Sequence, residues 1–153
     1  MTIVLEAARL RGIGEVEQVH GEIVQTGQFT TQTSDTGSNV TSYQPSAFSG
    51  TINPQSNANL VKATFIGGAF PTGTNNCQIR IQRGTSWTGA SSCSMTEAGT
   101  GCPAISSGID QPSASSATYT VYRRVNNAAT TLQCPYCNAA GDTNVIILEE
   151  LMG

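Results

Sequence analysis

Two segments near the C-terminus, Ala117–Val125 and Asn144–Leu151, constrain the fold of this chain most. In the first, Tyr119, Val121 and Val125 fall on one face of an extended chain. A repeat of two residues is typical of a β-strand, whereas a helix repeats every 3.6 residues. In the second segment both faces are apolar, which predicts a strand covered by its own core and by a second layer or a neighbouring subunit. We expect the two segments to form an antiparallel pair.

Three earlier segments also alternate. The sequence predicts strands at Gly21–Thr31, Leu60–Ile66 and Cys77–Arg83, each with its apolar residues on one face. Between them lie two long polar stretches, Gln32–Asn59 and Gly84–Gly108, which we interpret as loops. In the first loop, the expected core anchors are Tyr43, Phe48 and Ile52. Gly67-Gly68 predicts a bend after the second of the three strands.

The composition favours the same fold class. Only 11% of the residues are charged, against a typical ~25%. The remaining polar residues are mainly Thr, Ser, Asn, Gln and Gly, which suit strands and turns better than exposed helical faces. We therefore predict an all-β protein, an antiparallel β-sandwich or jelly roll, in which residues 15–153 form a single domain.

Residues 1–14 are predicted to be an N-terminal arm. Their apolar residues alternate poorly and need a partner surface, and Gly12 and Gly14 separate them from the domain. We expect Ile3, Val4, Leu5 and Leu10 to make this contact, either within the chain or with a second protein.

Charge and hydropathy argue against two classes of partner. The net charge is −3, and the few basic residues are too scattered to hold a nucleic-acid backbone, so we expect no nucleic-acid partner. No segment has the roughly 18 apolar residues of a membrane span, and the N-terminus has no signal-peptide core, so we expect no membrane partner and synthesis in the cytosol.

Cys134-Pro135-Tyr136-Cys137 is the motif that most suggests an enzyme. Two cysteines at this spacing at the start of a helix support thiol–disulfide chemistry, and the tetrapeptide resembles the active-site motif of glutaredoxins. Here the motif lies between two predicted strands and is followed by a polar loop rather than a helix, which does not fit a glutaredoxin. We therefore rank thiol oxidoreductase activity third, after two non-enzymatic functions. We predict no catalytic residue, no cofactor and no metal.

The other cysteines leave several states open. Cys93 and Cys102 could join Cys134 and Cys137 in a four-cysteine metal site, but their spacing matches no common zinc site. A disulfide between Cys93 and Cys102 is the better alternative, and Cys77 is expected to be a packed core thiol.

The sequence resembles a known family in four short pieces. They are the Ile-Arg-Ile-Gln-Arg strand at Ile79–Arg83, the Asp-x-Pro turn at Asp110–Pro112, the Thr-Tyr-Thr-Val strand at Thr118–Val121 and the final strand at Asn144–Glu150. Together they resemble the trimeric jelly-roll domains, of the tumour-necrosis-factor and complement type, found in head-decoration, head-fibre and tail-fibre proteins of tailed phages. The resemblance covers roughly Gly50 to Leu151.

The resemblance implies a non-enzymatic protein of the virion, which packs as a homotrimer about a threefold axis. We expect a capsid decoration, cement or head-fibre protein, whose partner is the major capsid protein or another virion protein. It would assemble in the host cytoplasm and leave with the particle. Tyr122, Ile146 and Leu148 are the expected trimer-interface residues. The alternative is a receptor-binding tail fibre or spike that holds a host surface glycan, with Trp87 as the contact.

Overall fold

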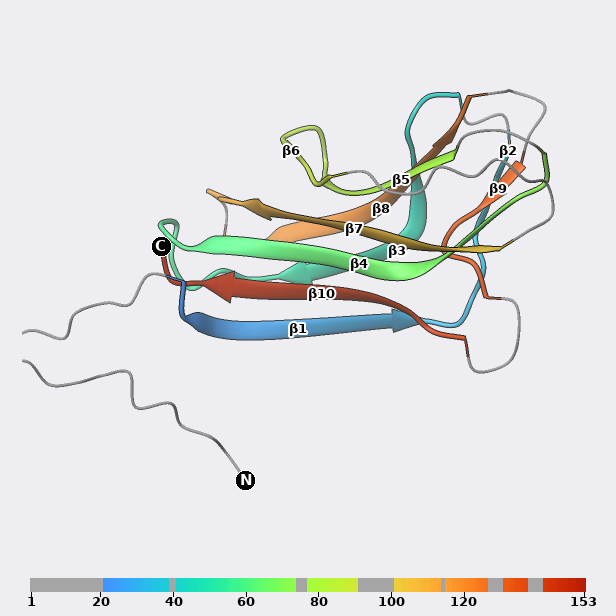
Figure 1. Cartoon of the computed structure of the whole chain (residues 1–153). Helices are drawn as coiled ribbons and strands as arrows, with labels where there is room; N and C mark the ends of the chain where they lie inside the picture. Colours follow the sequence, from blue (N-terminus) through green and yellow to red (C-terminus); the bar gives the residue numbers. More distant parts are fainter. Residues whose placement is uncertain are drawn as a thin grey trace, which may run out of the picture.

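The computed structural model describes residues 21–38, 41–73, 77–90, 101–113, 115–126, 131–137 and 142–153. These residues form ten strands and no helix, which confirms the predicted all-β class (Figure 1). The strands are β1 (Ile23–Thr31), β2 (Thr36–Ser38), β3 (Gln44–Ile52), β4 (Leu60–Pro71), β5 (Cys77–Arg83), β6 (Trp87–Thr88), β7 (Cys102–Asp110), β8 (Ala117–Val125), β9 (Thr131–Gln133) and β10 (Asn144–Leu151). The predicted arm, residues 1–14, lies outside the described residues.

The strands form two antiparallel sheets that pack face to face as a β-sandwich (Figure 1). In the first sheet the order is β1-β10-β4-β7, and the short strands β9 and β2 continue from the far end of β4. In the second sheet the order is β3-β8-β5-β6. Without β2 and β9, the two strand orders are those of a jelly roll, in which the first strand lies beside the last, and the chain crosses between the sheets at every step except from β5 to β6.

The two segments with the strongest alternation do not pair with each other. β8 lies between β3 and β5, whereas β10 lies between β1 and β4 in the other sheet. The expected antiparallel pair is therefore wrong. Both strands are central, with hydrogen-bonded neighbours on either side, and this position explains why their patterns are so regular.

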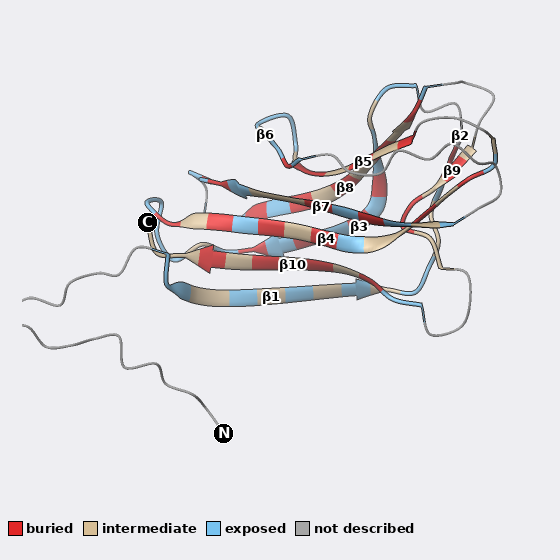
Figure 2. Cartoon of the chain, viewed as in Figure 1, coloured by how far each residue is buried: buried red, intermediate tan, exposed pale blue. Residues whose placement is uncertain are grey.

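The inner faces of the sheets form one core, as the alternating colours along the strands show (Figure 2). The predicted inward-facing sets of β4, β5 and β8 are confirmed, whereas Ile23, predicted to share a face of β1 with Phe29, is 52% exposed. Fully buried in the core are Val61, Ala63 and Phe65 of β4, Cys77, Ile79 and Ile81 of β5, and Tyr119, Val121 and Val125 of β8.

Both predicted long loops contain strands. Gln32–Asn59 includes β2 and β3, and Gly84–Gly108 includes β6 and most of β7. The sequence did not predict β3, because its inner face carries small residues as well as Phe48 and Ile52. Gly50, for example, lies beneath the Phe29 ring, where an added Cβ would come within 2.4 Å of the ring. Of the predicted anchors, Phe48 and Ile52 are buried in the core, but Tyr43 lies outside it.

The predicted bend at Gly67-Gly68 is also wrong, because β4 continues through both glycines to Pro71. A Cβ on Gly68 would lie 2.8 Å from the Tyr136 carbonyl oxygen, and one on Gly67 would lie 2.1 Å from Asn144 Oδ1. The glycines therefore allow the segment between β9 and β10 to pack directly on the backbone of β4.

Candidate functional site

The outer face of the first sheet carries the exposed apolar residues of the described chain. Ile66 is 44% exposed, Ile105 53% and Ile109 56%. These three residues lie on β4 and β7, next to the half-buried Val145 and Ile147 of β10, and a fourth exposed apolar residue, Ile23 at 52%, lies at the start of β1. We call Ile66, Ile105, Ile109, Val145 and Ile147 the isoleucine face. It is an apolar surface on the face of the first sheet that points away from the core.

The strand register brings these residues together. Val145 is opposite Ile66, and Ile66 is opposite Ile105, so a row of three β-branched side chains crosses β10, β4 and β7. Residues directly opposite in an antiparallel sheet place their side chains on the same face. The row is therefore a continuous apolar band rather than a set of scattered residues.

The polar residues within this face satisfy one another. Lys62 Nζ lies 2.9 Å from Glu149 Oε2, and the hydroxyls of Thr64 and Ser107 are 2.8 Å apart. Since the ion pair carries no net charge, the centre of the face presents no unbalanced charge to a partner. Such a face can meet another apolar surface without leaving a charge buried and unpaired.

Two of the predicted interface residues are not on any surface. Ile146 and Leu148 are fully buried in the core of the single chain. Because they point between the sheets, they have no area to give to a neighbouring subunit, and the prediction that they form an interface is corrected. Tyr122 is half-buried on the outer face of β8, in the other sheet. The residues of β10 that face outward are Val145, Ile147, Glu149 and Leu151.

The Cys134–Cys137 segment follows β9 and has no helical turn in the described residues. Cys134 is fully buried, and this burial raises the pKa of its thiol far above the ordinary range. Cys137 Sγ accepts a hydrogen bond from Asn144 Nδ2 at 3.0 Å. Both cysteines are free thiols. An exposed, low-pKa thiolate is what a thiol oxidoreductase requires, and Cys134 has the opposite environment.

A buried arginine fixes this segment. Arg123 of β8 is 5% exposed, and its Nη1 donates to the carbonyl oxygens of Cys134 at 2.6 Å and Asp35 at 3.2 Å. It also forms an ion pair with the Asp35 carboxylate at 3.0 Å. Burial by itself would raise the pKa of Asp35. Hydrogen bonds from Arg123 and from the Ala47 amide, together with the arginine's charge, outweigh burial and hold this pKa below its usual value. The bonds of Arg123 thus hold Cys134 against β8.

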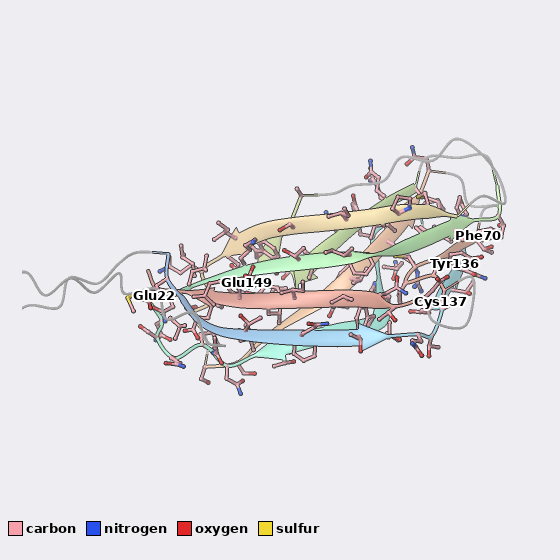
Figure 3. The ribbon with its side chains drawn as sticks, turned by 60° about the horizontal axis from the view of Figure 1, so that its bottom comes forward. Glu22, Phe70, Tyr136, Cys137 and Glu149 are labelled. Atoms are coloured by element: carbon pink, nitrogen blue, oxygen red, sulfur yellow. The ribbon has the colours of Figure 1, made fainter. Side chains whose placement is uncertain are left out.

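A pocket of about 600 Å³ opens beside the same segment. Its wall includes Phe70 and Tyr136, whose rings stack with centroids 4.8 Å apart, and it continues to Asp142 and Thr143. Figure 3 places Phe70, Tyr136 and Cys137 together at one end of the sandwich, away from Glu22 and Glu149. Aromatic rings beside polar groups are a common lining of sugar sites.

Trp87, the predicted glycan contact, packs inside its own chain. Its ring meets Tyr119 edge-on at 5.6 Å, and its Nε1 donates to the Ile109 carbonyl oxygen at 2.9 Å. Below it, Tyr119 donates to the Asp110 carboxylate, which also pairs with Arg83. The indole therefore has a structural role, joining β6 to β7 and β8.

The remaining predictions meet the described residues only in part. The expected arm contacts, Ile3, Val4, Leu5 and Leu10, lie outside them, as does Cys93, which belongs to both the predicted disulfide and the four-cysteine site. Within the described ranges, no three His, Cys, Asp or Glu side chains gather as metal ligands, and no helix is long and apolar enough to cross a membrane.

The isoleucine face was not predicted from the sequence. Ile105, Ser107 and Ile109 do alternate, but only the register places them beside Ile66 and Val145. No protein-family model matches this chain, and no curated protein matches its sequence.

Proposed function

We propose that this protein is a non-enzymatic structural component of a virus particle, a decoration, cement or head-fibre protein that binds a capsid as a homotrimer. The isoleucine face is the observation that supports this proposal most. Soluble monomers rarely expose contiguous apolar patches, and larger patches commonly mark contacts between proteins. The partner that this face fits is another copy of the same chain.

The properties of the face favour self-association. Its side chains are stiff and β-branched, so they lose little conformational freedom when they are covered. It has no unbalanced charge, because Lys62 is paired with Glu149. Subunit interfaces are depleted of charge at their centre in the same way. In a closed ring of three copies, the isoleucine face of each subunit would point toward the threefold axis.

The resemblance to phage jelly-roll domains supports the setting. The sequence pieces that carry it occupy β5, the end of β7, β8 and β10, which are four of the eight jelly-roll strands. A decoration protein needs no catalytic group. It stabilises a capsid by burying area across the junctions of coat subunits, so its function requires a rigid body and suitable faces.

The oligomeric state tests the interface. We expect the wild-type chain to elute as a trimer in size-exclusion chromatography with light scattering, and Ile66→Lys combined with Ile109→Lys to give monomers, because six lysines would meet near the axis. Ala47→Lys combined with Ser49→Lys adds the same charge to exposed positions on β3 and should stay trimeric. A monomeric wild-type protein at micromolar concentration would contradict the proposal.

Particle binding tests the arm. Deleting residues 1–14 should abolish binding to capsids while leaving a folded trimer, because Ile3, Val4, Leu5 and Leu10 supply the apolar contact. The measurement is cosedimentation of the deleted and full-length proteins with particles that lack the native protein. Full binding by the deleted chain would show that the contact lies elsewhere.

A second candidate is a receptor-binding protein that holds a host glycan. The pocket beside Phe70 and Tyr136 favours it, since a sugar ring could pack on the aromatic pair while hydroxyls meet Asp142. In this candidate the aromatic contact is the Phe70–Tyr136 pair rather than Trp87, whose half-buried ring already packs on Tyr119. Binding on a glycan array that is lost in Phe70→Ala would support this candidate, and a blank array together with capsid binding would favour the first.

A further inference from the structure

The outer face of the second sheet, opposite the isoleucine face, carries a positive charge that no described carboxylate neutralises. The strands β3, β8, β5 and β6 contain four arginines and no Asp or Glu. Arg83 and Arg123 point inward and pair with Asp110 and Asp35. Arg80 and Arg124 have no carboxylate partner among the described residues.

Tyr43 holds the two remaining arginines side by side. Arg80 Cζ lies 3.5 Å from the centroid of the Tyr43 ring, and Arg124 Cζ lies 4.9 Å from it. Both approach the ring face, where the electron density of the ring attracts a cation. The ring therefore offsets part of the repulsion between two like charges and fixes their positions.

Gln78 completes the arrangement. Its Oε1 accepts hydrogen bonds from Tyr43 Oη and from Arg124 Nε, each at 2.7 Å. The hydrogen bond to Nε thus orients the Arg124 guanidinium. Arg80 Nε is buried with no acceptor, so within the described chain its charge is balanced only by the Tyr43 ring. We call Tyr43, Gln78, Arg80 and Arg124 the arginine cluster.

We propose that the arginine cluster is a docking site for an extended, acidic segment of a partner protein. Guanidinium groups bind carboxylates through two parallel hydrogen bonds, and here two of them are held ready beside one ring. Carboxylates at alternate positions of an extended chain are roughly 7 Å apart on one face. The preferred sequence is therefore Asp or Glu, any residue, then Asp or Glu.

The surroundings favour a protein over a nucleic acid. The chain has a net charge of −3, so its overall field repels a polyanion, and two cations neutralise too few phosphates for stable binding. The neighbouring residues on this face, Thr120 and Tyr122, are polar but uncharged and suit contact with an extended backbone. The site does not rest on the proposed trimer, because the isoleucine face belongs to the other sheet.

Fluorescence anisotropy with a labelled ten-residue peptide of alternating Glu and Thr tests the proposal on the full chain. We expect binding that weakens with added salt, and at least a tenfold loss of affinity in Arg80→Gln combined with Arg124→Gln. Thr85→Glu lowers the net charge by as much as a single Arg→Gln change, at an exposed position in the turn between β5 and β6, and should bind within twofold of wild type. Each single variant, Arg80→Gln and Arg124→Gln, should show a smaller loss, and circular dichroism checks that all variants are folded.

Three results would overturn the site: no peptide binding by the wild-type chain, unchanged affinity in the folded double variant, or equal binding of the peptide with Gln in place of Glu. Tighter binding of a single-stranded oligonucleotide of the same charge would also overturn it, since the partner would then be a nucleic acid. Oligomeric state is measured separately, so failure here is distinguishable from failure of the trimer.

Discussion

At the scale of single residues, one charged side chain occupies a position where the alternating pattern of its strand predicts an apolar side chain. Arg123 occupies an inward position of β8, between Val121 and Val125, and is buried. The periodicity of the strand marks this position as inward, but an arginine there looks like an error in the pattern. Only the structure supplies the reason, because Asp35, which neutralises Arg123, is 88 residues away in the chain.

Arg123→Ala should lower the free energy of unfolding by about 3 kcal/mol, because it removes the charge that pairs with the Asp35 carboxylate and the donor to the Cys134 carbonyl. Urea unfolding followed by circular dichroism measures the change. Arg124→Ala, at the neighbouring outward position, is the matched control and should cost less than about 1 kcal/mol. Equal losses in the two variants would mean that the buried network contributes little.

At the scale of elements, the strands that the sequence missed are those with small residues on their inner faces. β7 presents Ala104 and Ser106 to the core, and β3 presents Ser46 and Gly50. A strand is recognised in a sequence by large apolar residues at alternate positions, and these two strands have few. The space beside these small residues is filled by larger side chains from other strands, such as Phe29. The local sequence does not show which strands are neighbours.

Gly68→Ala should destabilise the protein by about 1–3 kcal/mol, because its methyl group would lie 2.8 Å from a backbone oxygen of Tyr136 and force β4 away from the segment before β10. Gly101→Ala is a suitable control, since its methyl group would meet side-chain rings and no backbone atom, Tyr136 at 3.2 Å and Phe70 at 3.9 Å. Thermal unfolding of both variants tests the difference. A Gly68→Ala protein as stable as wild type would show that this packing is loose.

At the scale of the whole molecule, two carboxylates join distant parts of the chain. Asp35 reaches Arg123, and Glu150 accepts hydrogen bonds from Asn59 and Gln25 at 2.7 and 2.5 Å and from the Gln55 amide. Burial alone would raise the pKa of Glu150, but these hydrogen bonds together hold it below its usual value. Both acids are therefore bound more strongly as carboxylates than as neutral acids.

Stability should consequently decline in acid. A carboxylate with a lowered pKa in the folded state stabilises the protein at pH values above its unfolded pKa, and this contribution is lost as the pH falls through the folded value. The ordinary values are 3.8 for Asp35 and 4.5 for Glu150, so the melting temperature should be nearly constant from pH 7 to about 5 and fall below about 4.5. Glu150→Gln should melt lower at pH 7 and show a shallower decline. A melting temperature that rises in acid would contradict this assignment.

The sequence by itself determined the class of this protein and much of its core. Low charge and alternating segments predicted a β-sandwich, and the inward sets of β4, β5 and β8 were identified residue by residue. This succeeds because the direction of a side chain from a strand is a local property with a period of two. The same rule showed that β10 is apolar on both faces, but not which of those faces is outward.

The tertiary structure decided everything that depends on which strands are neighbours. It placed β8 and β10 in different sheets, buried Ile146 and Leu148, and assembled the isoleucine face and the arginine cluster from separate strands. Strand pairing is made by backbone hydrogen bonds that any residue except proline can form, so the local sequence carries little information about it. The choice of neighbours is set by how the whole chain buries its apolar faces at once, and the surfaces left outside follow from that choice.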